Sequence, residues 1–212
     1  MLNPDLFAAQ FRVWFGPDAA VSAARIQGEK DLYPEEQVCI AGAVPRRRVE
    51  FSTGRWCARE ALRSLDLPPQ AIPVGPFRGP VWPPGISGSI SHAGGICVAV
   101  VSRTIHHKAL GIDLLETAQA LPIVEAAEPI LSAPGEDMSP LKVSVDPRVL
   151  RFGAKESVIK AVSGEVGRWI DFTEIRVRFA ASSFEASIDG FLPPVSGWWT
   201  SLGEFLLTAA RL

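Results

Sequence analysis

The chain has 212 residues, a length that suggests one large domain or two small ones. Its 21 Lys and Arg residues nearly balance its 23 Asp and Glu residues, which argues against a nucleic-acid coat protein or a basic membrane-surface protein. A hydrophobic content of 47% indicates a folded chain, and no apolar run approaches the ~20 residues of a membrane span.

Two further features bear on where the protein is found. The apolar stretch at residues 1–15 contains Asp5 and Arg12, which argues against a secretory signal. The three cysteines have no metal-like spacing, which is typical of a reducing compartment and of thiols that act as small buried residues. A cytoplasmic location is therefore expected.

Charge is distributed unevenly along the chain. Residues 1–105 carry 11 basic and 9 acidic groups, whereas residues 106–212 carry 10 basic and 14 acidic groups. A basic half and an acidic half suggest a cleft in which an anionic ligand and a cation meet. Pro-rich stretches at 67–84 and 131–147 predict long loops, because Pro removes a backbone donor and interrupts helices and strands.

The pattern of apolar and turn residues predicts both helices and strands. In the first half we expect a strand at 38–44, a helix at 52–65 with Ser52 or Thr53 as N-cap, and a hairpin of strands 86–92 and 96–102 around Ala93-Gly94-Gly95. In the second half we expect a strand at 109–115, a helix at 148–162 ended by Gly164, an antiparallel pair at 175–179 and 184–188, and a closing strand at 205–212. Strands and helices do not alternate regularly, so an α+β fold is favoured.

Four arginines are candidates for a basic stripe in the first half. Arg55, Arg59 and Arg63 are four residues apart and share a face of the predicted helix, while Arg48 lies at or before its start. Such a stripe is either an ordinary solvated face or a phosphate site, because guanidinium groups bind phosphate oxygens bidentately.

A second candidate lies in the segment Gly88-Ser89-Ile90-Ser91-His92. Small residues near a turn allow close backbone approach, and a His at a strand end can hydrogen-bond a phosphate. Neighbouring residues Ser91 and His92 point to opposite faces of a strand, which excludes a local nucleophile–base pair. A purely structural histidine is the alternative.

Acidic residues in the second half form the third candidate. Asp113 interrupts an apolar strand, which is costly unless its carboxylate is paired or bound to metal. Glu156 and Lys160 lie one turn apart on a predicted helix, either as an exposed ion pair or as part of a site. Together, Asp113 and Glu156 offer oxygen ligands of the kind that Mg²⁺ prefers.

These motifs follow one another in an order and spacing that match a known family. They are Arg48-x-x-Phe51-x-x-Gly54-Arg55-x-x-Ala58-Arg59, Pro80-x-Trp82-Pro83, Gly88-Ser89-Ile90-Ser91-His92, Gly111-Ile112-Asp113 and Lys155-Glu156-Ser157-x-x-Lys160. Over about residues 46–163 the chain resembles the 4'-phosphopantetheinyl transferases, in the two-lobed branch of the surfactin-type enzymes and enterobactin synthase component D. The resemblance implies a monomer of two similar α+β lobes related by a pseudo-twofold axis, here 1–105 and 106–212, with coenzyme A in the cleft between them.

The resemblance also implies the reaction. The phosphopantetheine arm of coenzyme A would pass to a serine hydroxyl of an apo acyl or peptidyl carrier protein, with Mg²⁺ bound and adenosine 3',5'-bisphosphate released. Asp113 and Glu156 would bind the Mg²⁺, Glu156 would also be the candidate base for the serine, and Lys160 would neutralise charge on the transferring phosphate or leaving group. Phosphoryl transfer needs these elements, namely a metal, a cation and a proton acceptor held in line.

A coenzyme A site is implied in the same way. Ser89, His92 and Lys155 would contact phosphate oxygens, and the arginine candidates for the adenosine side are Arg48, Arg55, Arg59 and Arg78. Partners other than coenzyme A and a carrier protein, such as nucleic acid or a membrane, are not expected. Siderophore or polyketide biosynthesis is the expected context.

At one position the chain departs from the family pattern. Leu115 stands where many two-lobed members carry a second acidic residue, and Glu116 would face away from Asp113 in a regular strand. Water is expected to fill the missing coordination position, which Mg²⁺ tolerates.

Two other functions fit part of the pattern. A non-catalytic module of the same fold that binds coenzyme A or a carrier protein would not need Asp113, Glu156 and Lys160 together. A metal-dependent phosphohydrolase built on the same carboxylates and His92 would usually have more metal ligands.

Overall fold

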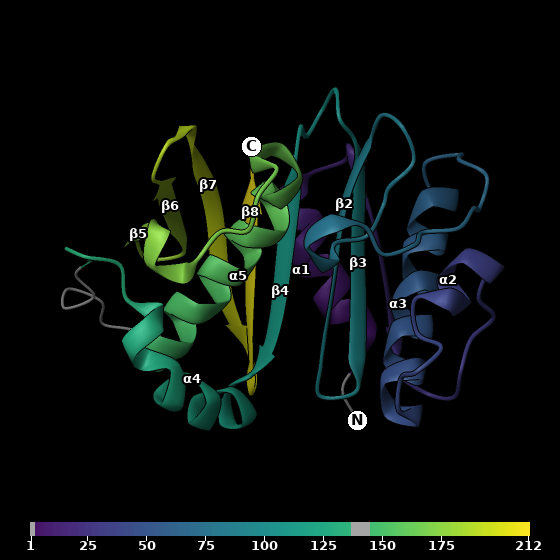
Figure 1. The fold of residues 1–212 in the computed structure, drawn as a ribbon, viewed down its shortest axis with the longest axis horizontal. Coiled ribbons are helices and arrows are strands. Elements are labelled where there is room, and N and C mark those ends of the chain that lie inside the picture. Colours follow the sequence, from purple (N-terminus) through teal and green to yellow (C-terminus); the bar gives the residue numbers. More distant parts are fainter. Residues whose placement is uncertain (1–2, 137–144) are drawn as a thin grey trace. The chain divides into compact units, whose positions relative to one another are not determined.

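A computed structural model describes residues 3–136 and 145–212 of the chain. The chain divides into two compact units, Met1–Lys108 and Ala109–Leu212. Each unit combines helices with its own antiparallel sheet, which confirms the α+β composition (Figure 1). None of the helices in the described ranges combines the length and the hydrophobicity needed to cross a membrane.

The first unit is built on a three-stranded sheet in the order β1-β3-β2. Its elements are α1 (Pro4–Phe15), β1 (Ala19–Arg25), α2 (Pro34–Val38), α3 (Pro45–Arg63), η1 (Pro76–Arg78), β2 (Ile86–Ala93) and β3 (Ile96–Arg103). The predicted hairpin is confirmed as β2 and β3. Gly94 and Gly95 have φ of 52° and 75°, so both residues adopt the left-handed conformation that a two-residue hairpin turn requires.

Helix α3 is longer than the sequence predicts. It begins at Pro45, which suits the first helical turn because its missing N–H needs no partner there. The hydroxyls of Ser52 and Thr53 donate to the Val49 carbonyl within the helix instead of capping its start. Arg48 therefore lies on the same helix as the other three arginines.

The strand predicted at 38–44 is wrong. Helix α2 ends at Val38, and the chain continues in short turns, with Ile40 N donating to Gln37 O and Ala43 N to Ile40 O. Val38 and Val44 are 77% and 67% exposed, so this apolar run does not form a core strand.

The second unit has a five-stranded sheet in the order β4-β8-β7-β6-β5. Its elements are β4 (Leu110–Glu116), α4 (Thr117–Leu131), α5 (Pro147–Val166), η2 (Phe172–Glu174), β5 (Ile175–Phe179), β6 (Ser183–Ile188), β7 (Phe191–Leu202) and β8 (Phe205–Arg211). The strands predicted at 109–115, 175–179, 184–188 and 205–212 are confirmed. Helix α5 packs against β4 and β8 and continues past Gly164 to Val166, and Gly167, with φ of 68°, forms its left-handed C-cap.

Helix α4 was not predicted from the sequence pattern. Helix α4 contains Pro122 and Pro129, yet Ala120, Val124 and Leu131 bury one of its sides in the core that it shares with α5. This packing outweighs the low helix propensity of proline. The loop predicted at 131–147 is thus partly helix at both ends, and its residues 137–144 lie outside the described part of the chain.

Two of the three cysteines are buried, as the sequence predicts. Cys57 and Cys97 are buried in the first unit, whereas Cys39 is exposed.

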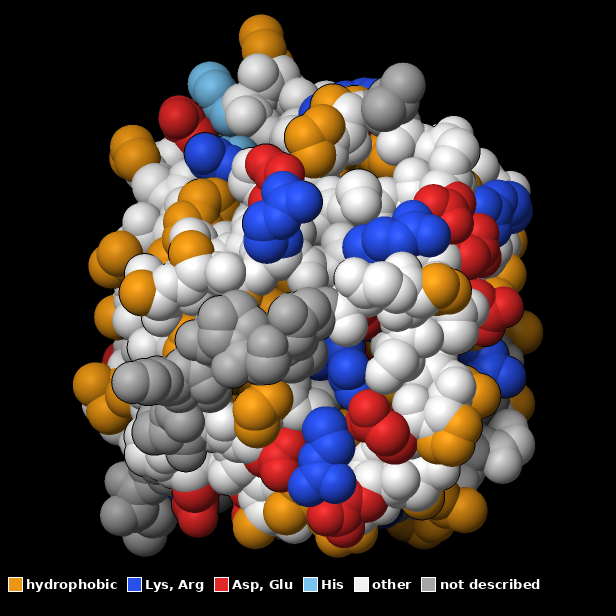
Figure 2. All heavy atoms as spheres, turned by 90° about the vertical axis from the view of Figure 1, so that its left-hand side faces the viewer, with side chains coloured by type: hydrophobic (Ala, Val, Ile, Leu, Met, Phe, Trp, Pro, Cys, Tyr) orange, Lys and Arg blue, Asp and Glu red, His pale blue; other side chains and the backbone are white. Residues whose placement is uncertain are grey.

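The surface carries charges of both signs. On the face drawn in Figure 2, basic and acidic side chains lie beside one another. Exposed ion pairs in the second unit include Arg148–Asp146, Arg168–Glu174 and Arg176–Asp189. Such pairs contribute only ~0–1 kcal/mol each, and their mixed sign is unlike the basic stripe of nucleic-acid binders.

Candidate active site

Strand β4 places a carboxylate in the interior of the second unit. Asp113 is 5% exposed and lies opposite Thr208 of β8. Its Oδ1 accepts a hydrogen bond from Lys160 Nζ of α5 at 2.5 Å. The cost of burying a charge on an apolar strand is therefore offset by an ammonium group from the facing helix.

Gly111 explains why α5 comes so close to β4. A Cβ atom at Gly111 would lie 2.0 Å from the Ser157 carbonyl oxygen and 2.6 Å from the Ala161 amide nitrogen. The helix backbone thus rests directly on the strand at this residue. Asp113 is two residues further along the same face, within reach of Lys160.

Glu156 and Lys160 lie one turn apart on α5, and both interact with Asp113. Burial raises the pKa of Glu156; the Lys160 ammonium opposes this rise and the Asp113 carboxylate adds to it. Burial of the Lys160 ammonium is outweighed by Asp113 and Glu156, which together raise the pKa of Lys160. The structure therefore brings all three predicted catalytic side chains into one electrostatic cluster.

The donor set of this cluster fits a magnesium ion. Asp113 and Glu156 contribute hard carboxylate oxygens, and Mg²⁺ is typically held by one or two carboxylates together with substrate phosphates and water. In the described ranges there is no group of three or more His, Cys, Asp and Glu side chains arranged to hold a metal. Asp113 and Glu156 are the residues that would hold such an ion.

Leu115 and Glu116 lie as the strand alternation predicts. Leu115 packs against the core of the second unit, and a Cβ atom at Gly153 of α5 would be 3.1 Å from Leu115 Cδ1. The Glu116 carboxylate accepts a hydrogen bond from Gln119 Nε2 at 2.6 Å. An apolar side chain thus occupies the position where the resemblance led us to look for a second acid.

Lys155 does not lie open to a phosphate. Its side chain is 0% exposed, and Nζ donates to the carbonyls of Leu131 and Phe172 and to Glu136 Oε2 at 2.7, 2.9 and 2.8 Å. Burial lowers the pKa of Lys155, an effect that Glu136 opposes. An ammonium group has three N–H donors, and all three have partners inside the second unit.

In the first unit, His92 lies beside Arg47, which was not among the predicted coenzyme A residues. Arg47 Nη1 is 3.2 Å from His92 Nε2, and Glu50 Oε2 is 3.9 Å from the same nitrogen. Arg48 instead forms an ion pair with Glu29, at 2.7 Å. Sequence reasoning missed Arg47, because the helix was expected to begin after it and its place on a helical face was therefore not assigned.

Ser89 lies on the opposite face of β2 from His92. Ser89 pairs with Val100 of β3, and His92 pairs with Cys97. A Cβ atom at Gly54 of α3 would be 3.8 Å from Cys97 Sγ, so the His92 face is the one covered by α3. Ser89 is 3% exposed. The structure therefore does not bring these two predicted phosphate ligands together on one face.

Two of the predicted arginines are buried and form hydrogen bonds within the first unit. Arg55 Nε donates to the Ile72 carbonyl at 2.6 Å, and burial lowers the pKa of Arg55 to about 10. Arg59 Nη1 donates to both carboxylate oxygens of Glu36, at 2.8 and 2.9 Å. Both arginines are 6% exposed, so the predicted stripe is not an open basic face.

The chain is similar to known transferases over most of its length. The N-terminal domain model of the 4'-phosphopantetheinyl transferases matches residues 35–102. The transferase Svp of Streptomyces mobaraensis is 35% identical, over 97% of this chain and 88% of its own length. The chain belongs to the 4'-phosphopantetheinyl transferase family.

Two further relatives of this transferase support the assignment. The transferase PptT of Mycobacterium tuberculosis is 39% identical over 71% of this chain and 66% of its own length. Enterobactin synthase component D of Salmonella typhi is 35% identical over 60% of this chain and 53% of its own length. The branch expected from the sequence motifs is therefore confirmed.

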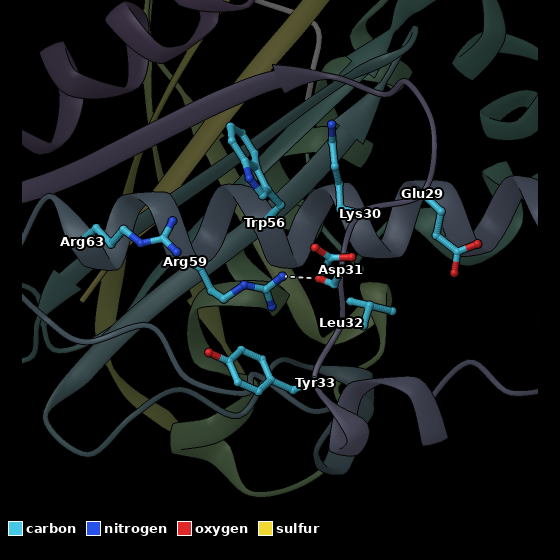
Figure 3. Close-up of a pocket in the computed structure, with 8 residues that line it drawn as sticks. All are labelled: Glu29, Lys30, Asp31, Leu32, Tyr33, Trp56, Arg59 and Arg63. Atoms are coloured by element: carbon cyan, nitrogen blue, oxygen red, sulfur yellow. Dashed lines mark hydrogen bonds between the residues drawn. The ribbon is translucent and has the colours of Figure 1, made fainter.

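The first unit of the transferase also contains a cavity of about 500 Å³. Its lining residues come from α3 and the segment before α2 and are Glu29, Lys30, Asp31, Leu32, Tyr33, Trp56, Arg59 and Arg63. Figure 3 shows Arg59 directed towards Asp31, whose carbonyl oxygen it contacts at 2.6 Å.

The remaining predicted arginine, Arg78, is exposed. Its backbone is left-handed, with φ of 60°.

Proposed function

We propose that the protein transfers the 4'-phosphopantetheine arm of coenzyme A to a serine hydroxyl of an apo acyl or peptidyl carrier protein. Mg²⁺ dependence and release of adenosine 3',5'-bisphosphate are part of the proposal. The observation that carries it is the cluster of Asp113, Glu156 and Lys160 where α5 crosses β4. A binding module would have no use for two carboxylates and an ammonium group held together at such desolvation cost.

In the proposed mechanism, Glu156 accepts the proton of the carrier serine. The serine oxygen forms a bond to the phosphorus of the phosphopantetheine group, and the bond from that phosphorus to the oxygen of the adenosine 5'-phosphate breaks. A carboxylate is by itself a weak base for an alcohol, so proximity to the serine and the bound ion would supply most of the effect. Mg²⁺ held by Asp113 and Glu156 would neutralise charge on the pyrophosphate oxygens.

Lys160 stabilises the charge that develops on the leaving group. Its ammonium stays protonated near neutral pH, because its pKa is raised above the ordinary value for lysine. It is hydrogen-bonded to Asp113 before substrate arrives, so little reorganisation is needed during the transfer. This role requires a permanent positive charge, which the two carboxylates maintain.

For the first unit we propose coenzyme A binding through His92, Arg47 and Arg48. Arg47 is 53% exposed in its side chain, so its guanidinium is accessible to a phosphate. The buried Arg55 and Arg59 would support this unit from within rather than bind the ligand. In each unit one long helix, α3 or α5, packs on the antiparallel sheet, which supports the proposed pair of similar lobes.

Relatives and sequence together suggest the context. One matched relative is named as a component of enterobactin synthase, which supports a siderophore pathway. A monomer acting in the cytoplasm, as the sequence predicts, completes the proposal.

The test is to mix the protein with coenzyme A, Mg²⁺ and several apo carrier proteins and to measure carrier mass. We expect a mass increase of one phosphopantetheine group on the carrier, abolished in Glu156→Gln and in Asp113→Ala and dependent on Mg²⁺. Unchanged mass for every carrier would overturn the proposal. Phosphate release without a carrier would indicate a hydrolase instead.

A further inference from the structure

Helix α5 carries three basic residues on one face, and each pairs with an acidic residue in or shortly after α4. Arg148 pairs with Glu125, Arg151 with Glu128 and Lys155 with Glu136. The exposed fractions of the three basic side chains fall in this order from 38% to 6% to 0%. The innermost pair, Lys155–Glu136, lies directly before Glu156 in the chain.

The Lys155–Glu136 pair joins four segments of the second unit. Lys155 Nζ bonds the carbonyls of Leu131 and Phe172, and Glu136 accepts the amides of Ala133 and Val177 at 3.1 and 2.8 Å. Both side chains of the pair are 0% exposed. Buried charged hydrogen bonds of this kind are costly to break, so the pair acts as a rigid clamp on α5.

A clamp at Lys155 controls where the reacting groups lie. Successive residues of a helix are fixed about 100° apart, so holding Lys155 fixes the rotation of α5 about its axis. That rotation determines whether Glu156 and Lys160 face Asp113. A misplacement of about 1 Å at such a site can lower the rate about a hundredfold.

We propose that Lys155 and Glu136 are positioning residues for the transfer reaction, and that Lys155 does not bind a coenzyme A phosphate. The inference rests on the proposed function. It predicts that loss of either charge misplaces Glu156 and Lys160, which lowers kcat and leaves the KM for coenzyme A unchanged.

The two roles of Lys155 predict opposite effects for Glu136. If Lys155 bound a phosphate, removing the neighbouring negative charge in Glu136→Gln would leave the site more positive and lower the KM for coenzyme A. If the pair is a clamp, Glu136→Gln and Lys155→Met both lower kcat. Glu125→Gln is the matched control, because it makes the same chemical change in an ion pair to α5, Arg148–Glu125, that is exposed instead of buried.

The experiment compares kcat and the KM for coenzyme A in the wild-type protein and these variants, with hydrogen exchange at the amides of Ala133 and Val177. We expect about a tenfold or greater loss of kcat in Lys155→Met and Glu136→Gln, an unchanged KM and faster exchange at both amides. The double variant should be no slower than the slower single variant. Glu125→Gln should match the wild type.

Each outcome bears on the inference. Wild-type kcat in Glu136→Gln would overturn it, as would a raised KM in Lys155→Met with a lowered KM in Glu136→Gln. Should Lys155→Met fail to fold, Glu136→Gln alone decides. A wild-type protein that modifies no carrier refutes the proposed function instead, and the exchange rates then still report whether the clamp exists.

Discussion

The contact between α5 and β4 predicts a large effect for Gly111→Ala. The added Cβ would lie 2.0 Å from the Ser157 carbonyl oxygen, so strand and helix must separate by about 1.4 Å to reach an ordinary contact of 3.4 Å. Overpacking of this kind costs about 1–3 kcal/mol. The same shift would lengthen the 2.5 Å bond from Lys160 to Asp113 beyond hydrogen-bonding distance.

Two measurements check this prediction. Urea unfolding should show a loss of about 1–3 kcal/mol in the free energy of unfolding, and carrier modification should show kcat reduced about a hundredfold. Gly164→Ala is the control, because it lies in the same helix, has no atom within 4 Å of its Cβ position and should gain about 0.5–1 kcal/mol. Wild-type stability and kcat in Gly111→Ala would refute the reasoning.

Three further predictions follow from the charged groups. The pKa of Glu156 is raised, and a protonated carboxyl group cannot accept the serine proton. As the pH is lowered, kcat should therefore begin to fall at a pH above ~4.3, the ordinary pKa of glutamate. A kcat that stays constant down to that pH would contradict this prediction. Arg47→Ala should raise the KM for coenzyme A about tenfold with little change in kcat, and an effect confined to kcat would rule out a binding role. Glu36→Gln should lower the free energy of unfolding by about 3 kcal/mol, because it leaves the buried Arg59 guanidinium without its counter-charge; calorimetry that finds an unchanged Tm would refute this.

Local patterns carried most of the fold that the sequence predicted. The β2–β3 hairpin depends on two adjacent glycines, and β5 and β6 depend on strict alternation, so both were readable from short windows. Helix α4 was not, because its prolines are outweighed by packing against α5, which is distant in sequence. The apolar run at 38–44 failed for the opposite reason, since nothing packs over most of it.

In the site, too, local spacing was predictable and distant contacts were not. The spacing of Glu156 and Lys160 on one helical face, and the interruption of a strand by Asp113, identified a cluster that the structure does bring together. The roles of Arg59 and Lys155 were not predictable from spacing. Each is decided by a carboxylate about twenty residues away, Glu36 of α2 and Glu136 after α4, and its position depends on how that segment folds back over the long helix.

The contrast between the exposed Cys39 and the buried Cys57 and Cys97 has a practical consequence. A maleimide dye added to the native protein should attach at Cys39, beside the end of α2, without mutagenesis. Fluorescence from that dye would then report on the first unit, while carrier modification reports on the proposed reaction.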